Sequence, residues 1–327
     1  MNLMKAAVYE SKKDITVLDR PIPDVKEGWA LVKVDYCGIC GTDLLIFSGN
    51  HPRAQKGLTI GHEFTGRIVN HPDLTEGTPV TVRPLLSCGE CDPCLTGNSH
   101  VCESLGLLGI DQSGGMAEYV SVPVDEIYPL PSEISLKRGA LVEPFAVAVH
   151  AIRLSNFKPG DLVTVFGAGP IGLSTAISLK LFGARQVTIV EVQPFRKEVA
   201  ESLGFEVIDP SQSDTYIAEA DIVFDCAAHQ SVAKLLVKST KIQGQIVLVG
   251  TYKYPTELDL QNITFKELSV KGTRVYTKKD YKIAISLLST DFDFEKLITQ
   301  EFPIGSVSKS FQFLTSGGNS VKVLISL

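Results

Sequence analysis

The feature that most constrains the fold is residues 144–272, where short apolar runs alternate with longer helical patterns. The runs DLVTVFG, QVTIVE, DIVFDCA and QIVLVG are typical of buried strands, and the segments between them are typical of helices. Strands joined through helices form a parallel sheet with helices on its faces. The sequence therefore predicts a doubly wound α/β unit in this part of the chain.

The first of these strands runs directly into the glycine-rich turn GAGPIG, residues 167–172, and then into a helix. Gly167 permits the tight turn, Gly169 lets the backbone approach a pyrophosphate, and Gly172 lets helix and strand pack closely. The phosphates would lie at the helix N-terminus, where backbone N–H groups are unpaired. We therefore expect a dinucleotide to bind at this turn, through Gly167, Gly169, Pro170, Ile171 and Gly172.

The dinucleotide is expected to be NAD. Glu191 ends the second strand, nineteen residues after Gly172, where a carboxylate hydrogen-bonds the ribose hydroxyls and repels a 2′-phosphate. The alternative interpretation of Glu191 is a solvated carboxylate at a strand end. Arg196 keeps NADP open as a second possibility, because it either reaches a 2′-phosphate or lies along the adenosine or in a helix salt bridge.

Four of the seven cysteines have the spacing C-x2-C-x2-C-x7-C in a stretch rich in glycine and proline. Four thiolates this close can surround a tetrahedral zinc ion and leave no position open for chemistry. The alternative is four unrelated or redox-active thiols. We predict a structural zinc that staples the loop at about residues 85–105. Its ligands are Cys88, Cys91, Cys94 and Cys102.

A second set of metal-binding residue types is dispersed: Cys40 in CGICGTD, His62 and Glu63 in GHE, and Glu143 in VEPF. Each alone is a weak signal, because a lone cysteine is usually a small buried hydrophobe and a His-Glu pair is usually a surface feature. A catalytic zinc needs three protein ligands and one open position. A cysteine, a histidine and a glutamate would provide them and would balance the charge of the ion.

The two ends of the chain have a different pattern of apolar and polar residues. From residue 5 to about 128, short β-rich runs are punctuated by Gly, Pro, Asn and Asp, which predicts an irregular all-β domain. After residue 272, a helical stretch and a last alternating strand, VKVLIS, have no place in the nucleotide fold. We therefore expect three segments: residues 1–145, residues 146–275, and residues 276–327 returning to the first domain.

Charge and hydropathy exclude several classes of protein. The formal net charge of -6 and the absence of a Lys/Arg block argue against nucleic acid or an anionic membrane as partner. No apolar run approaches the roughly 18 residues of a membrane span, and the first residues lack a signal-peptide pattern. We expect a cytoplasmic protein with a small-molecule partner.

Together, these motifs resemble the zinc-containing medium-chain dehydrogenase/reductase (alcohol dehydrogenase) family, in its sorbitol (polyol) and threonine dehydrogenase branch. The resemblance covers nearly the whole chain and rests on CGICGTD, GHEFTG, the four-cysteine lobe, SGGMAEYVSVP, VEPFAVAVHA and GAGPIG, in that order. It implies a GroES-like β domain that also receives the C-terminal tail, a Rossmann domain, and an active site in the cleft between them. It also implies a homodimer or homotetramer.

The resemblance implies a catalytic zinc held by Cys40, His62 and Glu63, with Glu143 binding it directly or through its water. A cysteine at the position of Glu143 is typical of simple alcohol dehydrogenases, so the glutamate resembles the polyol branch. Asp43 would fix the orientation of a ligand.

The expected proton path departs from the family pattern. By resemblance, Thr42 would hydrogen-bond the substrate hydroxyl and begin proton removal. Many relatives carry a histidine five residues after the ligand cysteine, and this chain has Leu45 there. His51 is the nearest replacement, or it is a solvent-exposed loop histidine.

The expected reaction is hydride transfer from a secondary hydroxyl of a polyol, sugar or sugar acid to NAD. A threonine or butanediol dehydrogenase with the same metal and cofactor is an alternative. A third interpretation is a catalytically silent nucleotide-binding structural or sensor protein. Zinc-free members of the wider family lack the Cys and GHE ligands, and the presence of these residues here argues against it.

Overall fold

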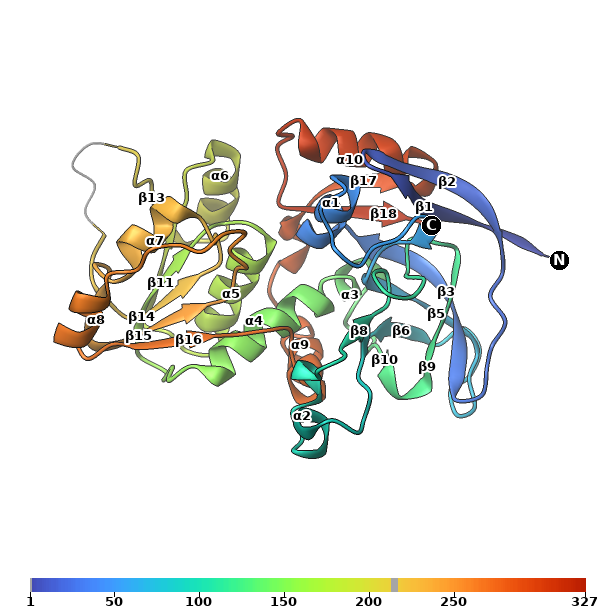
Figure 1. Ribbon diagram of the computed structural model, residues 1–327, viewed down its shortest axis with the longest axis horizontal. Helices are drawn as coiled ribbons and strands as arrows, with labels where there is room; N and C mark the ends of the chain where they lie inside the picture. Colours follow the sequence, from blue (N-terminus) through green and yellow to red (C-terminus); the bar gives the residue numbers. More distant parts are fainter. Residues whose placement is uncertain (1, 213–216) are drawn as a thin grey trace. The chain divides into compact units, whose positions relative to one another are not determined.

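The computed structural model describes residues 2–212 and 217–327. The chain forms two compact units: unit 1 comprises Met1–Glu143 with Ala284–Leu327, and unit 2 comprises Pro144–Ile283. Unit 1 consists mainly of β-strands, whereas unit 2 has a parallel sheet with helices (Figure 1). The predicted α/β class is therefore confirmed.

Unit 2 is built around a six-stranded sheet with the order β13-β12-β11-β14-β15-β16, in which every neighbouring pair is parallel. The strand order reverses between β11 and β14. In open α/β sheets, ligands bind outside the carboxyl ends of the strands at such a reversal. The strands are β11 (Leu162–Phe166), β12 (Gln186–Val190), β13 (Glu206–Ile208), β14 (Ala220–Asp225), β15 (Thr240–Leu248) and β16 (Ser269–Gly272).

The helix that follows β11, α5 (Pro170–Leu181), is buried nearly all round, because every residue from Gly172 to Leu179 is buried. Its small residues allow close packing on the sheet, so α5 lacks the polar face of a surface helix.

Among the described residues, no helix combines the length and the apolar composition that a membrane crossing requires. The other helices of unit 2 are α6 (Pro194–Ser202), α7 (Gln230–Leu236) and α8 (Leu260–Phe265).

Two helices, α4 (Val142–Leu154) and α9 (Lys278–Leu288), continue across the boundaries between the units. His150 Nδ1 of α4 lies 2.8 Å from Asp280 Oδ2 of α9, and Arg153 pairs with the same carboxylate. Burial opposes ionisation of Asp280, but hydrogen bonds from His150, Thr277 and Arg153 hold its pKa well below the usual range. This ion cluster anchors α4, whose first turn carries Glu143.

Unit 1 contains a seven-stranded sheet with the order β10-β6-β5-β3-β18-β17, in which β9 also pairs with β3. The C-terminal strand β18 lies antiparallel to β3, so the end of the chain completes this sheet. A second sheet has the order β2-β1-β4, and β7 pairs with β8. The strands are β1 (Leu3–Ser11), β2 (Asp14–Pro21), β3 (Trp29–Gly38), β4 (Leu58–Thr59), β5 (Glu63–Asn70), β6 (Pro79–Val82), β7 (Leu85–Leu86), β8 (Gly106–Leu107), β9 (Tyr119–Pro123), β10 (Ile127–Pro129), β17 (Ile298–Pro303) and β18 (Lys322–Ser326).

Helix α1 packs against the C-terminal helix α10 through two aromatic rings, since the centroids of Phe47 and Phe311 lie 5.2 Å apart with the rings tilted by 33°. Ser308 of α10 also donates a hydrogen bond to the carbonyl of Ile15 in β2. The tail therefore supports the N-terminal part of unit 1 by a helix as well as by a strand. The helices of unit 1 are α1 (Gly41–Phe47), α2 (Asp92–Leu95), α3 (Leu136–Gly139) and α10 (Val307–Thr315), with short 3-10 helices at Ser99–Val101, Val124–Glu126, Phe294–Leu297 and Ile304–Ser306.

Candidate active site

The four cysteines of the predicted zinc lobe come together at α2 and the 3-10 helix that follows it. Their sulfur atoms lie within 4.8 Å of one another, and the Cys102 sulfur is 3.5 Å from Cys88 and 3.8 Å from Cys91. Sulfurs bound to zinc at 2.3 Å in a tetrahedron are about 3.8 Å apart. The backbone N–H of Cys88 lowers the pKa of Cys102 to about 6, which favours the thiolate that a metal needs. The cluster therefore fits a zinc ion with four thiolate ligands.

The second metal cluster is assembled by the pairing of β3 with β5. Gly38 at the end of β3 lies opposite Glu63 at the start of β5, which brings Cys40 and His62 side by side. One ligand atom from each of Cys40, His62 and Glu63 lies within 4.8 Å of the other two. The geometry depends on glycine, since a Cβ atom at Gly38 would lie 2.1 Å from the Glu63 carboxylate.

This cluster is buried and rich in negative groups. His62 is 4% and Glu63 2% exposed. Burial lowers the pKa of His62, but the charges of Cys40, Asp43 and Glu143 raise it well above its usual value. The set of one sulfur, one nitrogen and one carboxylate is a typical ligand set for catalytic zinc. The residues therefore fit the ion that the sequence predicts.

Asp43 links the two sides of the cluster. One of its oxygens accepts the backbone N–H of Cys40 at 2.8 Å, and the other lies 3.8 Å from His62 Nδ1. Neither that second oxygen nor His62 Nδ1 has a hydrogen-bond partner among the described residues, although both are buried. Asp43 therefore lies on the Nδ1 side of His62 and can orient the ring.

Glu143 lies in the first turn of α4 and is not a member of the cluster of three. Its charge nevertheless contributes to raising the pKa values of His62 and Lys322, so it lies near enough to act on the cluster. The structure thus brings three of the four predicted ligands together, and the fourth acts on them through its charge.

Lys322 was missed by the sequence analysis. It lies on β18, is 2% exposed, and forms an ion pair with the Glu63 carboxylate while donating to the carbonyl of Ile39 at 3.1 Å. A lysine inside the apolar alternation VKVLIS was the available signal, because a lysine is almost never fully buried unless it is paired. Lys322 provides the one buried positive side chain in contact with the Glu63 carboxylate among the described residues.

Thr42, the first residue of the predicted proton path, lies close to the cluster. The Thr42 hydroxyl oxygen is 3.8 Å from the Cys40 sulfur. His51 Nδ1 accepts the backbone N–H groups of Arg53 and Ala54 at 3.3 and 3.2 Å, which leaves Nε2 as the protonated nitrogen. Burial is the main cause of the lowered pKa of His51, and the charges of Arg53 and His62 add to it. Leu45 has no polar group to contribute.

In unit 2, the glycine turn leads from β11 into α5 with Gly169 as N-cap. Gly167 has a φ of 98°, and a Cβ atom at Gly172 would lie 1.8 Å from the carbonyl oxygen of Gly167. Both positions therefore require glycine. Pro170 and Ile171 form the start of α5, and Arg196 Nη1 would lie 3.6 Å from a Cβ atom at Gly169, so the guanidinium lies over the turn.

Glu191 has a contact that the sequence did not reveal. One carboxylate oxygen accepts the backbone N–H of Ala168 at 2.7 Å, and the other accepts those of Val192 and Gln193 at 2.8 and 2.9 Å. The side chain therefore holds the glycine turn in place. Each oxygen has further lone pairs, so these contacts leave the carboxylate able to accept from a ribose hydroxyl.

Comparison with known proteins agrees with this geometry. Residues 26–132 match the alcohol dehydrogenase GroES-like domain family, and residues 170–290 match the zinc-binding dehydrogenase family. The (R,R)-butanediol dehydrogenase of Bacillus subtilis is 34% identical over 98% of this chain and 99% of that protein. The L-galactonate-5-dehydrogenase of Escherichia coli K12 is 32% identical over 95% of each chain. The L-threonine 3-dehydrogenase of Bacillus subtilis is 31% identical over 93% of each chain.

Solved structures show the same fold over the whole chain. An alcohol dehydrogenase from Escherichia coli CFT073 in complex with NADH has a TM-score of 0.93, 31% identity and complete coverage of both chains. A protein classed as a zinc-binding dehydrogenase from Sinorhizobium meliloti 1021, bound to NADP, has a TM-score of 0.94, also with 31% identity and complete coverage of both chains. With its GroES-like unit and its Rossmann unit, this chain belongs to the zinc-containing medium-chain alcohol dehydrogenase family and is a zinc-dependent, NAD(P)-linked dehydrogenase.

Proposed function

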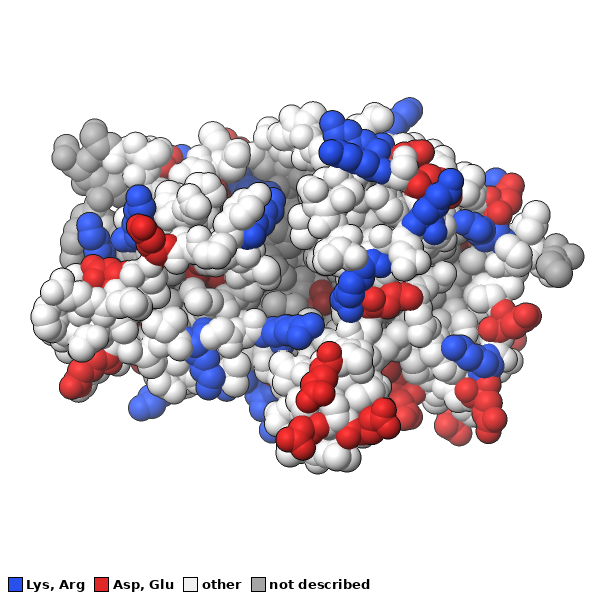
Figure 2. Space-filling model, in the orientation of Figure 1, with Lys and Arg blue, Asp and Glu red and all other residues white. Residues whose placement is uncertain are grey.

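We propose that this chain oxidises a secondary hydroxyl group of a polyol, sugar or sugar acid, with NAD as the hydride acceptor. The observation that carries the proposal is the cluster of half-buried Cys40 with buried His62 and Glu63, in a chain that also has a complete dinucleotide turn. Figure 2 shows acidic and basic side chains interspersed on the visible face, which suits a small-molecule substrate better than a polyanion.

The names of the relatives support this substrate class. Butanediol, galactonate and threonine all have a hydroxyl-bearing carbon next to a carbon that carries a second polar group. A threonine or butanediol dehydrogenase therefore remains the second candidate, and it would use the same metal and cofactor residues. The substrates differ in the number of hydroxyl groups beyond the reacting one, so the choice among them depends on side chains outside the metal cluster.

The roles proposed for the residues follow from their contacts. Cys40, His62 and Glu63 would hold zinc, with Glu143 binding it directly or through its water. Zinc supplies a Lewis acid that lowers the pKa of a bound hydroxyl. Thr42 would accept the hydroxyl proton, since its side chain lies beside the Cys40 sulfur. With Nδ1 of His51 occupied by backbone N–H groups and the ring proton on Nε2, the ring has no free lone pair in this conformation, so water would carry the proton on from Thr42.

The cofactor preference proposed for the Rossmann unit is NAD. Glu191 is buried at the end of β12 and is anchored to the glycine turn. A 2′-phosphate placed beside it would meet a negative charge that cannot move away. Arg196 lies over the turn and is positioned for the pyrophosphate or adenosine side of the cofactor, together with Gly167, Gly169 and Gly172.

We also propose that the protein is a homo-oligomer that associates through β16. This strand forms one edge of the parallel sheet, and all four of its residues are exposed. Large exposed apolar side chains occur on β16 and in the segments before it: Ile242, Tyr254, Leu260, Phe265 and Val270. An uncovered edge strand with neighbouring apolar groups pairs readily with a second copy of itself.

Loss of a catalytic ligand is expected to abolish oxidation without affecting the nucleotide unit. Cys40→Ser and His62→Ala should lower kcat by orders of magnitude, while NAD affinity measured by calorimetry stays nearly unchanged. Turnover is measured as NADH absorbance with polyols, sugar acids, threonine and butanediol. Cys37→Ala is the control, because Cys37 is a buried cysteine outside the cluster. Normal oxidation by a Cys40→Ser protein that lacks the catalytic zinc would contradict the assignment.

Replacement of Lys322 is expected to lower the free energy of unfolding only when the metal is absent. Lys322→Met should lower the free energy of unfolding of protein lacking the catalytic zinc by about 3 kcal/mol, because it leaves the buried Glu63 carboxylate unpaired. Bound zinc neutralises that carboxylate, so zinc should stabilise the variant more than the wild type. Urea unfolding with and without zinc measures this, with Lys322→Arg as control. If zinc leaves the difference in free energy of unfolding between Lys322→Met and the wild type unchanged, Glu63 is not a ligand.

Replacement of the ribose-facing carboxylate is expected to change cofactor preference. Glu191→Ser should raise the ratio of kcat/KM for NADP to that for NAD by about tenfold or more, because the repulsion is lost and Arg196 remains nearby. The ratio cancels any general loss from the loosened turn. Adding Arg196→Ala should remove the gain with NADP. An unchanged ratio in Glu191→Ser would show that this carboxylate does not select the cofactor.

A charge on the exposed sheet edge is expected to dissociate the oligomer. Val270, which is 39% exposed, lies on β16, and Val270→Glu would place a negative charge opposite its copy across a symmetric contact. Sedimentation velocity should then show monomers where the wild type shows dimers or tetramers. Leu181→Glu, at the end of α5, is the matched control and should not change the sedimentation coefficient. A monomeric wild type would refute the proposal.

A further inference from the structure

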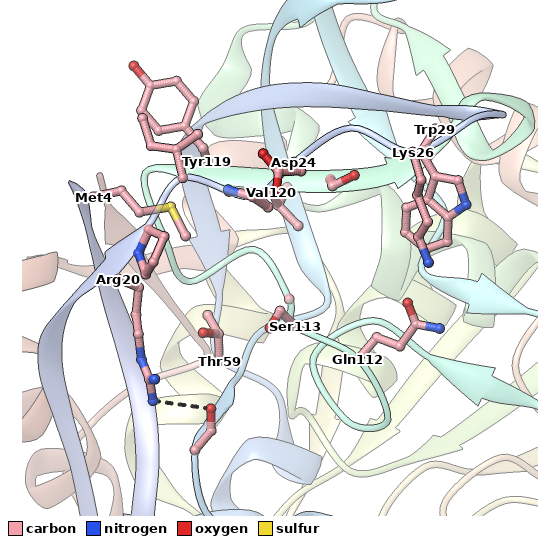
Figure 3. A pocket seen from close by; sticks show the side chains of 16 residues that line it. Met4, Arg20, Asp24, Lys26, Trp29, Thr59, Gln112, Ser113, Tyr119 and Val120 are labelled. Atoms are coloured by element: carbon pink, nitrogen blue, oxygen red, sulfur yellow. Dashed lines mark hydrogen bonds between the residues drawn. The ribbon is translucent and has the colours of Figure 1, made fainter. Parts of the chain in front are cut away.

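A polar pocket of about 440 Å³ lies in unit 1 between the loop at residues 53–58 and the loop at residues 110–113. We refer to it as the Arg53 pocket. A second pocket of about 470 Å³ adjoins it and shares Gln112 and Ser113, which Figure 3 shows among its lining side chains. The lining of the Arg53 pocket is dominated by groups that donate and accept hydrogen bonds: Arg53, Gln55, Lys56, Asp111, Gln112 and Ser113.

The two loops are tied together by Arg53. Its Nη1 donates to the carbonyl of Leu105 at 2.8 Å and lies 3.1 Å from Asp111 Oδ2. The same Asp111 oxygen accepts the backbone N–H of Leu107 at 2.8 Å. The arginine and the carboxylate are therefore held before any ligand arrives, which reduces the entropy lost on binding.

These contacts leave part of each group available. Within the described ranges, Nε and Nη2 of Arg53 and Oδ1 of Asp111 have no protein partner, and both side chains are partly exposed. Two donors thus lie beside one acceptor. Adjacent hydroxyl groups, each of which both donates and accepts, match this arrangement. The charge of Arg53 is balanced by Asp111, so the pair offers hydrogen bonds and little net charge.

Backbone packing connects the pocket to the metal cluster. A Cβ atom at Gly109 would lie 2.4 Å from the carbonyl oxygen of Gly61, and one at Gly114 would lie 2.0 Å from it. The loop that carries Asp111 is therefore pressed against the residue that precedes the ligand His62. Only glycine permits this approach.

The other loop reaches the metal cluster through His51. The His51 ring accepts the backbone N–H of Arg53, and its lowered pKa, caused mainly by burial, also depends on the charges of Arg53 and His62. His51 therefore lies within electrostatic range of both the pocket and the metal ligands. Both loops of the Arg53 pocket are therefore connected to the metal ligands, one through Gly61 and the other through His51.

We propose that the Arg53 pocket binds the hydroxyl groups of the substrate that are not oxidised, and that Arg53 with Asp111 selects polyhydroxylated substrates over an apolar diol. This inference rests on the proposed function and specifies its substrate class. A site built to hydrogen-bond hydroxyl groups rejects an analogue that lacks them, because its polar groups are then left without partners. Because Arg53 is paired with Asp111 and Lys56 with Glu10, sugar alcohols and the corresponding sugar acids are bound alike.

The test compares kcat/KM for a hexitol, the matching hexonate and 2,3-butanediol in the zinc-loaded enzyme. Arg53→Met is expected to lower kcat/KM about tenfold for both six-carbon substrates, mainly through KM, because one or two hydrogen bonds are lost. Oxidation of 2,3-butanediol should change less than twofold. Asp111→Asn is expected to lower kcat/KM for the two six-carbon substrates as well, by a smaller factor, and again to leave 2,3-butanediol oxidation nearly unchanged. Arg20→Met is the matched control, because Arg20 lines the neighbouring pocket and contacts the carbonyl of Gly57 at 3.5 Å (Figure 3).

Each other outcome overturns the inference. An equal loss with all three substrates would show that Arg53 only supports the loops, and zinc content with thermal unfolding would report that damage. A loss confined to the hexonate would show that Arg53 recognises a carboxylate. A wild-type enzyme that oxidises butanediol or threonine but neither six-carbon substrate would overturn the inference and leave the enzyme class intact. A wild-type enzyme that is inactive on every alcohol would overturn the proposed function as well.

Discussion

The ion pair between Lys322 and Glu63 joins the last strand of the chain to a predicted metal ligand 259 residues earlier. The surroundings contain Cys40, Asp43 and Glu143, and a carboxylate buried among such groups is costly without a positive partner. Lysine supplies that partner when β18 pairs with β3. The C-terminal strand thus completes a sheet and at the same time makes the negative pocket compatible with a folded state.

The two functional centres use the same physical device in different units. In unit 1, Asp43 holds the start of α1 through the backbone N–H of Cys40 and lies on the Nδ1 side of His62. In unit 2, Glu191 holds the glycine turn through the backbone N–H of Ala168. In each case a buried carboxylate is fixed by local backbone donors and can act on a charged neighbour without a cost of reorganisation. The fold therefore fixes the positions of both carboxylates before a ligand binds.

The choice of substrate depends on loops more than on the strands that carry the metal ligands. The segments that form the Arg53 pocket have no regular periodicity, and their positions depend on glycines that let the backbones touch, such as Gly61 and Gly109. The alternative substrates expected from the sequence share the metal and cofactor residues, so those residues cannot distinguish them. Discrimination depends on a few polar side chains, such as Arg53 and Asp111, that the loops bring together from distant positions.

The amino-acid sequence by itself determined the local motifs: the strand, turn and helix around GAGPIG, and the four cysteines within one loop. These depend on residues close in the chain, where spacing dictates geometry. The partner of Glu63, the contact of Glu191 with the turn, and the Arg53–Asp111 pair were decided by tertiary structure. They depend on strand register and on loop packing between residues distant in sequence, and no local spacing encodes such distances.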